Sequence, residues 1–433
     1  MGFYPVIRPA NRNALSKDIL PSQVDPFVND DAWLRRAMAV DARASSRGDI
    51  LTCPESEATV FPRYASKMKG AYLWDLDGNR YIDYMLGYGP VILGHADDRV
   101  DLEAIRQLRL GNCMAPLWSP QQVRLTELLC EILPGAECAY LLKTGSEANS
   151  AAVRLARIHT GRTRVLRWGY NGWHDWAAEF PAGVPAQMRD LTRVLPCQDP
   201  DILRQMFAEQ PDQIACVLMM PFNEDTTSAA NLHELCEITH ENGALFILDE
   251  MRSGFRMAVG GAQEYFGVSA DLCAYSKAMA NGYPISAVAG RRDVMVGLSR
   301  TRISSTFYAG PVEMAAALST IDVLRNTDAL ATVWRQGTAL QAGLAKIVAD
   351  TGVCAEVVGY PPMPFLRFID SDPAARAATR SRFYIEVIRR GVLLHPDHQW
   401  FVSASHSDDD IAFTIDVCRT AMERAIDREN ARD

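Results

Sequence analysis

The hydrophobic pattern in the middle of the chain alternates between two kinds of segment. Continuous apolar runs, typical of buried strands, occur at 163–168, 214–220, 244–249 and 271–276. Amphipathic stretches with helical spacing also occur, and the clearest are 120–133 and 146–161. Buried strands that alternate with such helices predict an α/β fold, with a mainly parallel sheet covered by helices on both faces.

Toward the N-terminus the pattern predicts a short helix over 31–44 and a hairpin within 70–95. The hairpin is indicated by two short runs of aromatic and β-branched residues on either side of Asp77-Gly78. After about residue 325, short helix, strand and turn segments replace the alternation, and 408–426 predicts a final helix with an acidic start.

These changes of pattern predict the domain organisation. We expect an N-terminal segment, 1–93, that contributes to a small domain, a large domain over 94–320, and a C-terminal small α+β domain over 321–433. The total of 433 residues is long enough for two domains.

Composition and charge exclude several classes of protein. A net charge of −9 argues against nucleic acid as a partner, because phosphate binding needs clustered Lys and Arg. No apolar run approaches the roughly 20 residues of a membrane helix, and the N-terminus does not resemble a signal peptide. The ten cysteines include no CxxC pair and the eight histidines no HExxH pair, so we expect no metal site. A reduced, cytoplasmic protein is the natural expectation.

Three segments place polar residues at or just after the ends of apolar runs, where open parallel sheets bind ligands. The segment Thr144-Gly145-Ser146 opens a helix, and it is either an ordinary capped start with Glu147 or a phosphate site. Asp249 ends a run of apolar residues, where its carboxylate is costly to bury without a partner.

Two arginines near Asp249, Arg252 and Arg256, are possible ion-pair partners for it. Lys277 follows the run 271–276 and is either a side chain that reaches solvent or a catalytic amine.

A cluster of aromatic residues follows the strand predicted at 163–168. Its rings can cap a core or stack on a planar ligand. His174-Asp175 within the cluster suggests a hydrolase triad, but no GxSxG motif supplies a nucleophile. The aromatic residues are Trp168, Tyr170, Trp173 and Trp176.

A phosphate site, a carboxylate, a stacking aromatic and a lysine at a strand end are together what pyridoxal phosphate requires. The lysine forms a Schiff base with the cofactor's aldehyde, and the carboxylate keeps the pyridine nitrogen protonated.

Over roughly 62–415 the sequence resembles the class III, fold type I aminotransferases, and among them the branch of glutamate-1-semialdehyde aminomutase. The interval of 28 positions between Asp249 and Lys277 also fits that family. The resemblance rests on GAYLWDLDGNRYIDY, GYGPVILGH, TGSEANSAAVRLAR, GYNGWHD, ILDEMRSGFR, YSKAMANGYPISAVAGRRDVM, STFYAGPVEMAAA and FVSASHSDDDI.

The resemblance implies roles for individual residues. Lys277 matches the Schiff-base lysine, Asp249 the partner of the ring nitrogen, and Gly145 and Ser146 the phosphate-binding turn. Tyr170 matches the aromatic residue on one face of the ring.

Three further positions follow from the same resemblance. Met251 stands where the family usually has Val, on the other face of the ring, and Asn223 is a candidate for the ring hydroxyl. Thr306 matches a threonine that reaches the cofactor phosphate of the neighbouring subunit, which implies a homodimer.

Four departures from the family concern the substrate. Met220 replaces a Glu before Pro221, and Asn171 replaces the His of a Tyr-His-Gly motif. The segment 290–306 is about three residues shorter than in the aminomutase, and no counterpart of its carboxylate-binding Arg precedes Phe61. Five further residues are candidates for the wall of the substrate pocket: Arg63, Trp118, His174, His398 and Trp400.

We therefore expect an aminotransferase that uses pyridoxal phosphate to move an amino group from a donor to an oxo acceptor by a ping-pong route, in a specialised biosynthetic pathway. An aminomutase that moves the group within one molecule is the main alternative. A nucleotide-binding oxidoreductase is a remote one, because the chain has no GxGxxG fingerprint. A non-catalytic homologue is not expected, because Lys277 and Asp249 are both present.

Overall fold

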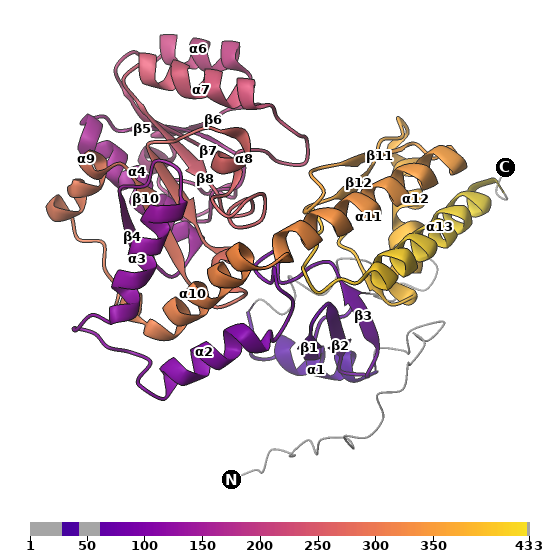
Figure 1. Cartoon of the computed structure of the whole chain (residues 1–433). Helices are drawn as coiled ribbons and strands as arrows, with labels where there is room; N and C mark the ends of the chain where they lie inside the picture. Colours follow the sequence, from indigo (N-terminus) through magenta and orange to yellow (C-terminus); the bar gives the residue numbers. More distant parts are fainter. Residues whose placement is uncertain (1–27, 43–60, 431–433) are drawn as a thin grey trace.

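The computed structural model of the chain describes residues 28–42 and 61–430 (Figure 1). Residues 1–27, Cys53 and the last two residues of the helix predicted over 31–44 lie outside these ranges. The helix itself spans Val28–Met38, so the prediction is wrong for residues 39–42, which are not helical. Within them, the large sheet has the strand order β4 (Cys138–Leu142), β10 (Ser286–Gly290), β9 (Leu272–Tyr275), β8 (Leu245–Asp249), β7 (Ile214–Met219), β5 (Arg164–Trp168) and β6 (Thr192–Val194).

The sheet is mainly parallel, as the sequence predicts, and the four apolar runs form β5, β7, β8 and β9. Only β10 runs antiparallel to both of its neighbours, β4 and β9. Parallel strands therefore deliver their carboxyl ends to one edge of the sheet. The strand β10 is too rich in small residues to stand out in the hydrophobic pattern.

Alternate residues of each strand pack on opposite faces of the sheet. Cys216 and Leu218 of β7 join a core cluster with helix α4, whereas Val217 and Met219 join the larger core cluster. The helices of this part are α2 (Asp98–Leu108), α3 (Pro120–Ile132), α4 (Gly145–Thr160), α5 (Ala186–Arg189), α6 (Pro200–Ala208), α7 (Ala229–Glu241), α8 (Ala262–Phe266), α9 (Arg292–Met295) and α10 (Pro311–Asn326). Both faces are thus covered, which explains why the strands are apolar throughout.

Short 3-10 helices also lie in this part of the chain. They are η2 (Lys277–Ala280), η3 (Val296–Arg300) and η4 (Thr306–Ala309). The helix η2 directly follows β9 and contacts α10.

A smaller sheet joins residues that are far apart in the sequence. The hairpin predicted around Asp77-Gly78 is confirmed, since β2 (Tyr72–Asp75) and β3 (Arg80–Asp83) pair antiparallel and Gly78 has a φ of 89°. Strand β1 (Ala65–Lys69) adds to β2, and β13 (Val392–Leu393) pairs parallel with β3. The N-terminal hairpin thus shares a sheet with the C-terminal region.

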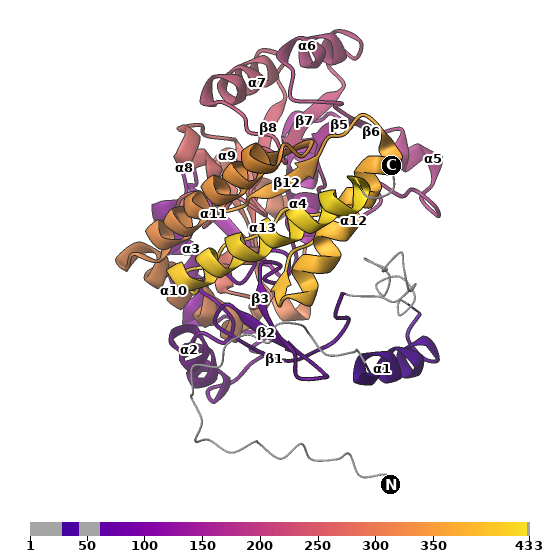
Figure 2. The same cartoon turned by 90° about the vertical axis from the view of Figure 1, so that its right-hand side faces the viewer.

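The rest of the C-terminal region is mainly helical. Helices α11 (Ala329–Thr351), α12 (Pro373–Arg389) and α13 (Asp408–Asn430) lie side by side in Figures 1 and 2, with α13 packed on both of the others. The antiparallel pair β11 (Ala355–Val358) and β12 (Phe365–Phe368) lies beside these helices. The first described helix, α1 (Val28–Met38), lies near the small sheet in Figure 1.

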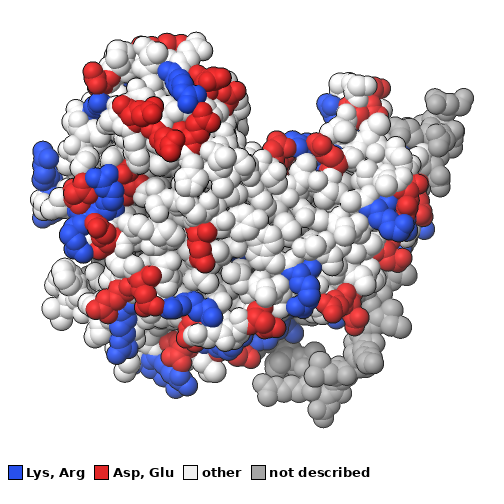
Figure 3. All heavy atoms as spheres, turned by 45° about the horizontal axis from the view of Figure 1, so that its top comes forward, with Lys and Arg blue, Asp and Glu red and all other residues white. Residues whose placement is uncertain are grey.

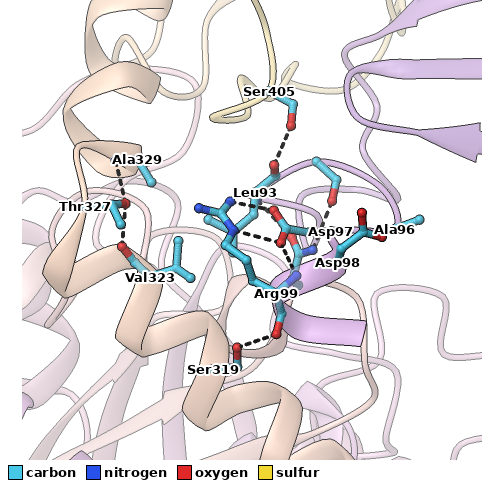
Figure 4. A network of polar contacts seen from close by, with 12 residues as sticks. Leu93, Ala96, Asp97, Asp98, Arg99, Ser319, Val323, Thr327, Ala329 and Ser405 are labelled. Atoms are coloured by element: carbon cyan, nitrogen blue, oxygen red, sulfur yellow. Dashed lines mark hydrogen bonds and ion pairs between the residues drawn. The ribbon is translucent and has the colours of Figure 1, made fainter. Parts of the chain in front are cut away.

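A polar network ties the start of α2 to two distant segments (Figure 4). Asp97 caps α2 by accepting a hydrogen bond from the backbone N–H of Arg99, and it also pairs with the Arg99 guanidinium. Ser319 of α10 donates to the Arg99 carbonyl, and Ser405 donates to the Leu93 carbonyl. The loop before α2 is thereby held to α10 and to the C-terminal region.

Acidic and basic side chains lie interspersed on the face shown in Figure 3, and no broad basic area covers it. Among the described helices, none combines the length and the apolar character that a membrane span requires.

Candidate active site

A cavity of about 980 Å³ lies at the carboxyl ends of the parallel strands. Residues that follow β5, β7, β8 and β9 line it, together with the start of α4, Tyr88 and residues 397–399. Seven of the eight predicted site residues line this cavity: Gly145, Ser146, Tyr170, Asn223, Asp249, Met251 and Lys277. Thr306, the eighth, is exposed at the start of η4 and does not line it.

Lys277 begins η2 directly after β9 and lines the cavity. Its φ of 37° lies in the left-handed region, which is strained for a residue with a side chain. Burial lowers the pKa of its amine to about 8, and the nearby charge of Arg252 adds to the effect. The amine is therefore far more easily deprotonated than an ordinary lysine.

Asp249 ends β8 and is buried at the floor of the cavity. Its Oδ2 accepts hydrogen bonds from the amides of Asn149 (2.7 Å) and Asn171 (2.9 Å), and its Oδ1 accepts one from the backbone N–H of Met251 (3.1 Å). Burial raises the pKa of this carboxyl, while the bonds from Asn171 and Asn149 act in the opposite direction.

The sequence suggests Arg252 or Arg256 as an ion-pair partner for Asp249, but neither forms one. Arg256 instead donates to the carbonyls of Val402 (3.0 Å) and Gly89 and packs over the ring of Phe401. The carboxylate of Asp249 is therefore held by neutral amides, which leaves its charge available to a cationic ligand.

The turn before α4 leaves no room for added side-chain atoms. A Cβ on Gly145 would lie 2.6 Å from the Met251 sulfur, and one on Gly172 would lie 2.5 Å from the Ser146 hydroxyl. Thr144 and Glu147 form the capping box that the ordinary helix start predicts, and Gly145 and Ser146 line the cavity, so the phosphate site stays a prediction. A helix N-terminus with free N–H groups favours an anion such as a phosphate.

Two side chains are suited to the faces of a planar ring. Tyr170 lines the cavity with 59% of its surface exposed, and Met251 lines it beside Gly145. Together with the anion-binding turn, the buried carboxylate and the lysine of lowered pKa, this set of donors fits pyridoxal phosphate. Among the described residues, no three His, Cys, Asp or Glu side chains form a group suited to a metal ion.

Of the five residues considered for the pocket wall, the structure places only His398 in this cavity. Arg63 pairs with Asp30 of α1 (2.6 Å), and Trp400 is fully buried in the core. Trp118 is 77% exposed outside the cavity, and the His174 ring is hydrogen-bonded to the Ser150 hydroxyl (2.7 Å). The Ser150 hydroxyl also accepts a hydrogen bond from the Trp176 indole (2.8 Å), and no carboxylate of the described residues pairs with His174, so the described part of the chain forms no Ser-His-Asp triad there.

Sequence reasoning missed Asn149, Gln399 and a role for Arg252 in the cavity. Asn149 lies within a helix whose spacing gives no sign that its amide turns toward Asp249. Gln399 comes from the far end of the chain and meets Arg252 (2.6 Å) only in the folded molecule. The one available signal for Asn149 was its position three residues after the phosphate turn, on the same side of the helix.

Comparison with known proteins gives the same assignment. The model of the aminotransferase class-III family matches residues 54–404. The 3-aminobutyryl-CoA aminotransferase of Cloacimonas acidaminovorans is 34% identical over 369 residues, covering 84% of this chain and 89% of the relative. The aminopentol aminotransferase of Sphingopyxis macrogoltabida is 33% identical (84% and 87% covered), and the glutamate-1-semialdehyde 2,1-aminomutase of Hyperthermus butylicus is 32% identical (84% and 92% covered).

Solved structures show the same fold. The FumI protein of Sphingopyxis sp. MTA144, in its PLP internal aldimine form, has a TM-score of 0.86 and 31% identity, covering 93% of this chain and 97% of that one. An omega-transaminase from Sphaerobacter thermophilus has a TM-score of 0.84 and 27% identity, covering 93% and 98%. The chain therefore belongs to the class-III aminotransferases, enzymes of the fold type I group that depend on pyridoxal phosphate.

Proposed function

We propose that this aminotransferase works by a ping-pong route on a specialised amine, which it deaminates before it aminates an oxo acceptor. The observation that carries this proposal is the pairing of Lys277 and Asp249 in one cavity, the first with a lowered pKa and the second buried and held by amides. Lys277 provides a group that can transfer protons, and Asp249 provides a fixed negative charge.

When bound, pyridoxal phosphate supplies an electron sink for the bond that breaks at the substrate carbon. Lys277 would hold the cofactor through its Nζ. As a free amine, the same Nζ would take a proton from the substrate carbon and later return it, as a general base and acid. A pKa of about 8 suits both directions of transfer near neutral pH.

The other residues of the cavity would orient the cofactor and stabilise its charges. We assign Asp249 to the ring nitrogen, Tyr170 and Met251 to the two ring faces, and Asn223 to the ring hydroxyl. Gly145 and Ser146 bind the phosphate at the start of α4, where the free N–H groups and helix dipole favour its charge.

The similar enzymes guide the choice of substrate. Two are named for 3-aminobutyryl-CoA and for aminopentol, and another is the 2'-deamino-2'-hydroxyneamine transaminase of Streptomyces kanamyceticus, 34% identical over 353 residues. None of these names is that of a common amino acid. We infer a specialised amine as donor, in agreement with Met220 and Asn171, which depart from the family pattern.

An intramolecular amino shift is the second candidate, because aminomutases are among the relatives at 32% identity. The two reactions differ in their need for a second substrate. If the enzyme converts one amino compound into its isomer with no oxo acceptor present, the transferase proposal is wrong.

We further propose a homodimer in which Thr306 reaches the cofactor phosphate of the partner. Its exposure supports this, and so does the apolar surface of the segment 102–123, which spans most of α2 and the start of α3. That segment exposes Leu102, Ile105, Leu108, Leu110, Leu117, Trp118 and Val123.

Two expectations from the sequence remain proposals. We propose the division into 1–93, 94–320 and 321–433, supported by the sheet that joins β3 to β13. We also propose a cytoplasmic location, supported by the nine described cysteines, which are all free thiols.

The cofactor's colour provides the direct test. The purified protein should be yellow, and borohydride should fix the cofactor irreversibly on Lys277, as peptide mass analysis would show. Lys277→Ala should prevent this attachment, whereas Lys346→Ala on the exposed side of α11 should not. Attachment at another residue in Lys277→Ala would contradict the assignment.

A further inference from the structure

The loop between β7 and α7, residues 220–228, forms one wall of the active-site cavity. Its lining residues are Met220, Pro221, Phe222, Asn223 and Glu224. Among the described residues, no backbone group of 222–227 is hydrogen-bonded to another backbone group. Side chains from other segments must therefore determine where this wall lies.

Side chains of the C-terminal region hold this loop at several points. Gln399, which is buried, donates to the Asn223 carbonyl (2.7 Å). The Tyr360 ring packs on the Phe222 ring, with 4.6 Å between the centroids. The Tyr360 hydroxyl donates to the Thr227 carbonyl (2.8 Å) and accepts from the Thr227 N–H (3.2 Å). A wall of the cavity is thus supported by a part of the chain that lies outside the large sheet.

The large-domain side supports the start of the loop. Gln198 donates to the carbonyls of Met220 and Pro221, both at 3.0 Å. Arg252 donates to the side-chain oxygen of Asn223 (2.6 Å). These contacts leave the middle of the loop to be held from elsewhere.

At the middle of the loop the link is ionic. Both Nη atoms of Arg367 donate to the Asp225 carboxylate, with Nη1 3.3 Å from Oδ2, and Nη1 also lies 3.9 Å from a Glu224 oxygen. The Arg367 Nε lies 2.7 Å from Glu356 of β11. Arg367 belongs to β12, on the side of the C-terminal region that faces the large sheet (Figure 1). Within the described chain, no other cation pairs with Glu224 or Asp225.

The strength of this link depends on the number of charges in it. The Asp225 side chain is 74% exposed and that of Arg367 30%, and an isolated pair of this kind contributes little. Three carboxylates around one planar guanidinium form a network, in which exposed charges do hold a geometry. The hydrogen bond from Arg367 lowers the pKa of Asp225, which therefore stays charged at neutral pH. Because these charges face water, salt screens them.

We propose that Arg367, which does not itself line the cavity, is a positioning residue of the active site. By holding Asp225 it fixes the loop 220–228, and so determines where Phe222 and Asn223 lie in the cavity. The shape of the cavity then depends on ionic strength. This inference rests on the proposed place of the cofactor at Lys277 and adds to it a residue from outside the cavity. Displacements of about 1 Å in such a wall are enough to affect a reaction.

The first measurement is hydrogen exchange of the holoenzyme, read by mass spectrometry from peptides that cover 220–228. In Arg367→Gln the three carboxylates lose their shared cation and repel one another. We therefore expect the amides of the loop to exchange about two- to fivefold faster, the factor for an ion pair of this exposure. Arg419→Gln is the matched control, because Arg419 is 31% exposed and pairs with Asp350 (3.0 Å) between α13 and α11. It should leave the exchange of the loop unchanged.

The second measurement reads the shape of the cavity from the bound cofactor. Methoxyamine and benzyloxyamine are uncharged probes of different size. Each replaces the Lys277 nitrogen on the cofactor carbon and releases the lysine amine, which bleaches the yellow colour.

For the wild-type enzyme, we expect the ratio of the two bleaching rates to change about two- to fivefold between about 0.01 M and about 1 M salt, where the screening length falls from about 30 to about 3 Å. Arg367→Gln should show the changed ratio already at low salt and should respond little to added salt. Arg367→Lys, which keeps the charge without the planar fork, should lie between the two. A purely structural ion pair would leave this ratio unchanged.

A second variant and thermal unfolding separate positioning from folding. Asp225→Asn, at an exposed position, should change the exchange and the ratio in the same direction as Arg367→Gln, and the double variant should add little. If Arg367→Gln lowers the unfolding temperature but changes neither readout, Arg367 serves the fold alone and the inference is wrong. Faster exchange with an unchanged ratio would also overturn it, because the loop would then move without affecting the cavity.

The same experiments distinguish this inference from the proposed function. If the wild-type protein does not bind the cofactor at Lys277, the proposed function fails, and the exchange of 220–228 still decides whether Arg367 holds the loop. If the cofactor binds at Lys277 and the ratio of rates does not respond to salt or to Arg367→Gln, the positioning inference alone is overturned.

Discussion

Asn171 donates a hydrogen bond of 2.9 Å to Asp249, and the two residues are 78 positions apart in the sequence. A second amide, that of Asn149, reaches the same carboxylate oxygen. The side-chain oxygens of both asparagines are buried without a hydrogen-bond partner among the described residues. Each amide donates an N–H group to Asp249, and Asn149 also donates to the Asn171 backbone carbonyl (3.1 Å). These bonds stabilise the negative charge of Asp249 in a buried setting that opposes it.

We predict that Asn171→Ala weakens cofactor binding by about 10- to 100-fold, the usual effect of losing a hydrogen bond to a charged group. The pKa of Asp249 is already raised by burial, and the loss of a donor raises it further. Titrating the apoenzyme with pyridoxal phosphate by absorbance measures the dissociation constant.

The control for this prediction is Asn326→Ala. Asn326 donates the same kind of bond to Asp322 (2.8 Å), but on the surface of α10. An equal effect of the two substitutions would show that Asn171 has no special role toward Asp249.

The lowered pKa of Lys277 predicts a pH dependence. Only the neutral amine attacks the cofactor's aldehyde, and its fraction rises with pH through a pKa of about 8. The rate at which apoenzyme binds pyridoxal phosphate covalently should therefore rise with a midpoint near pH 8 and level off only above that midpoint. Stopped-flow absorbance across a pH series measures it, and a midpoint near 10.5, the ordinary value for lysine, would contradict the burial argument.

Gly172→Ala should damage the phosphate turn. The φ of Gly172 is 109°, and the new Cβ would lie 2.5 Å from the Ser146 hydroxyl, so Ser146 must move. We expect more than about a tenfold loss of affinity for pyridoxal phosphate, a ligand whose phosphate depends on that turn.

Gly183→Ala provides the comparison, because Gly183 also has a positive φ, 84°, but no atom within 4 Å of its Cβ position. This variant carries the backbone strain without the contact. If it lost as much cofactor affinity as Gly172→Ala, strain rather than the contact with Ser146 would be the cause.

The proposed role of Thr306 predicts complementation between subunits. Thr306→Asp should inactivate the homodimer, because a carboxylate would repel the partner's cofactor phosphate. Lys277→Ala is itself inactive, but its hybrid with Thr306→Asp should contain one intact site of two. In a random mixture about half of the dimers are hybrids, so co-expression should recover about a quarter of the wild-type activity. Assay of the tagged hybrid tests this, and a hybrid with no activity would place Thr306 in its own subunit's site.

The sequence by itself determined the local elements and the type of chemistry. Apolar runs specified β5, β7, β8 and β9, and these runs are continuous because both faces of the sheet are covered. It also placed Lys277 and Asp249 at strand ends, since the carboxyl edge of a parallel sheet follows from strand direction.

Only the tertiary structure decided which side chains meet in the cavity. The contacts of Asn171 with Asp249, and of Arg252 with Gln399, join residues 78 and 147 positions apart. The hydrophobic pattern of the sequence does not predict such pairs. A hydrogen bond depends on where two particular atoms lie in the folded molecule, and the pattern only shows which segments are apolar. The hydrophobic pattern likewise could not show that Arg63 pairs with Asp30 of α1, or that the backbone of Lys277 is in the left-handed region.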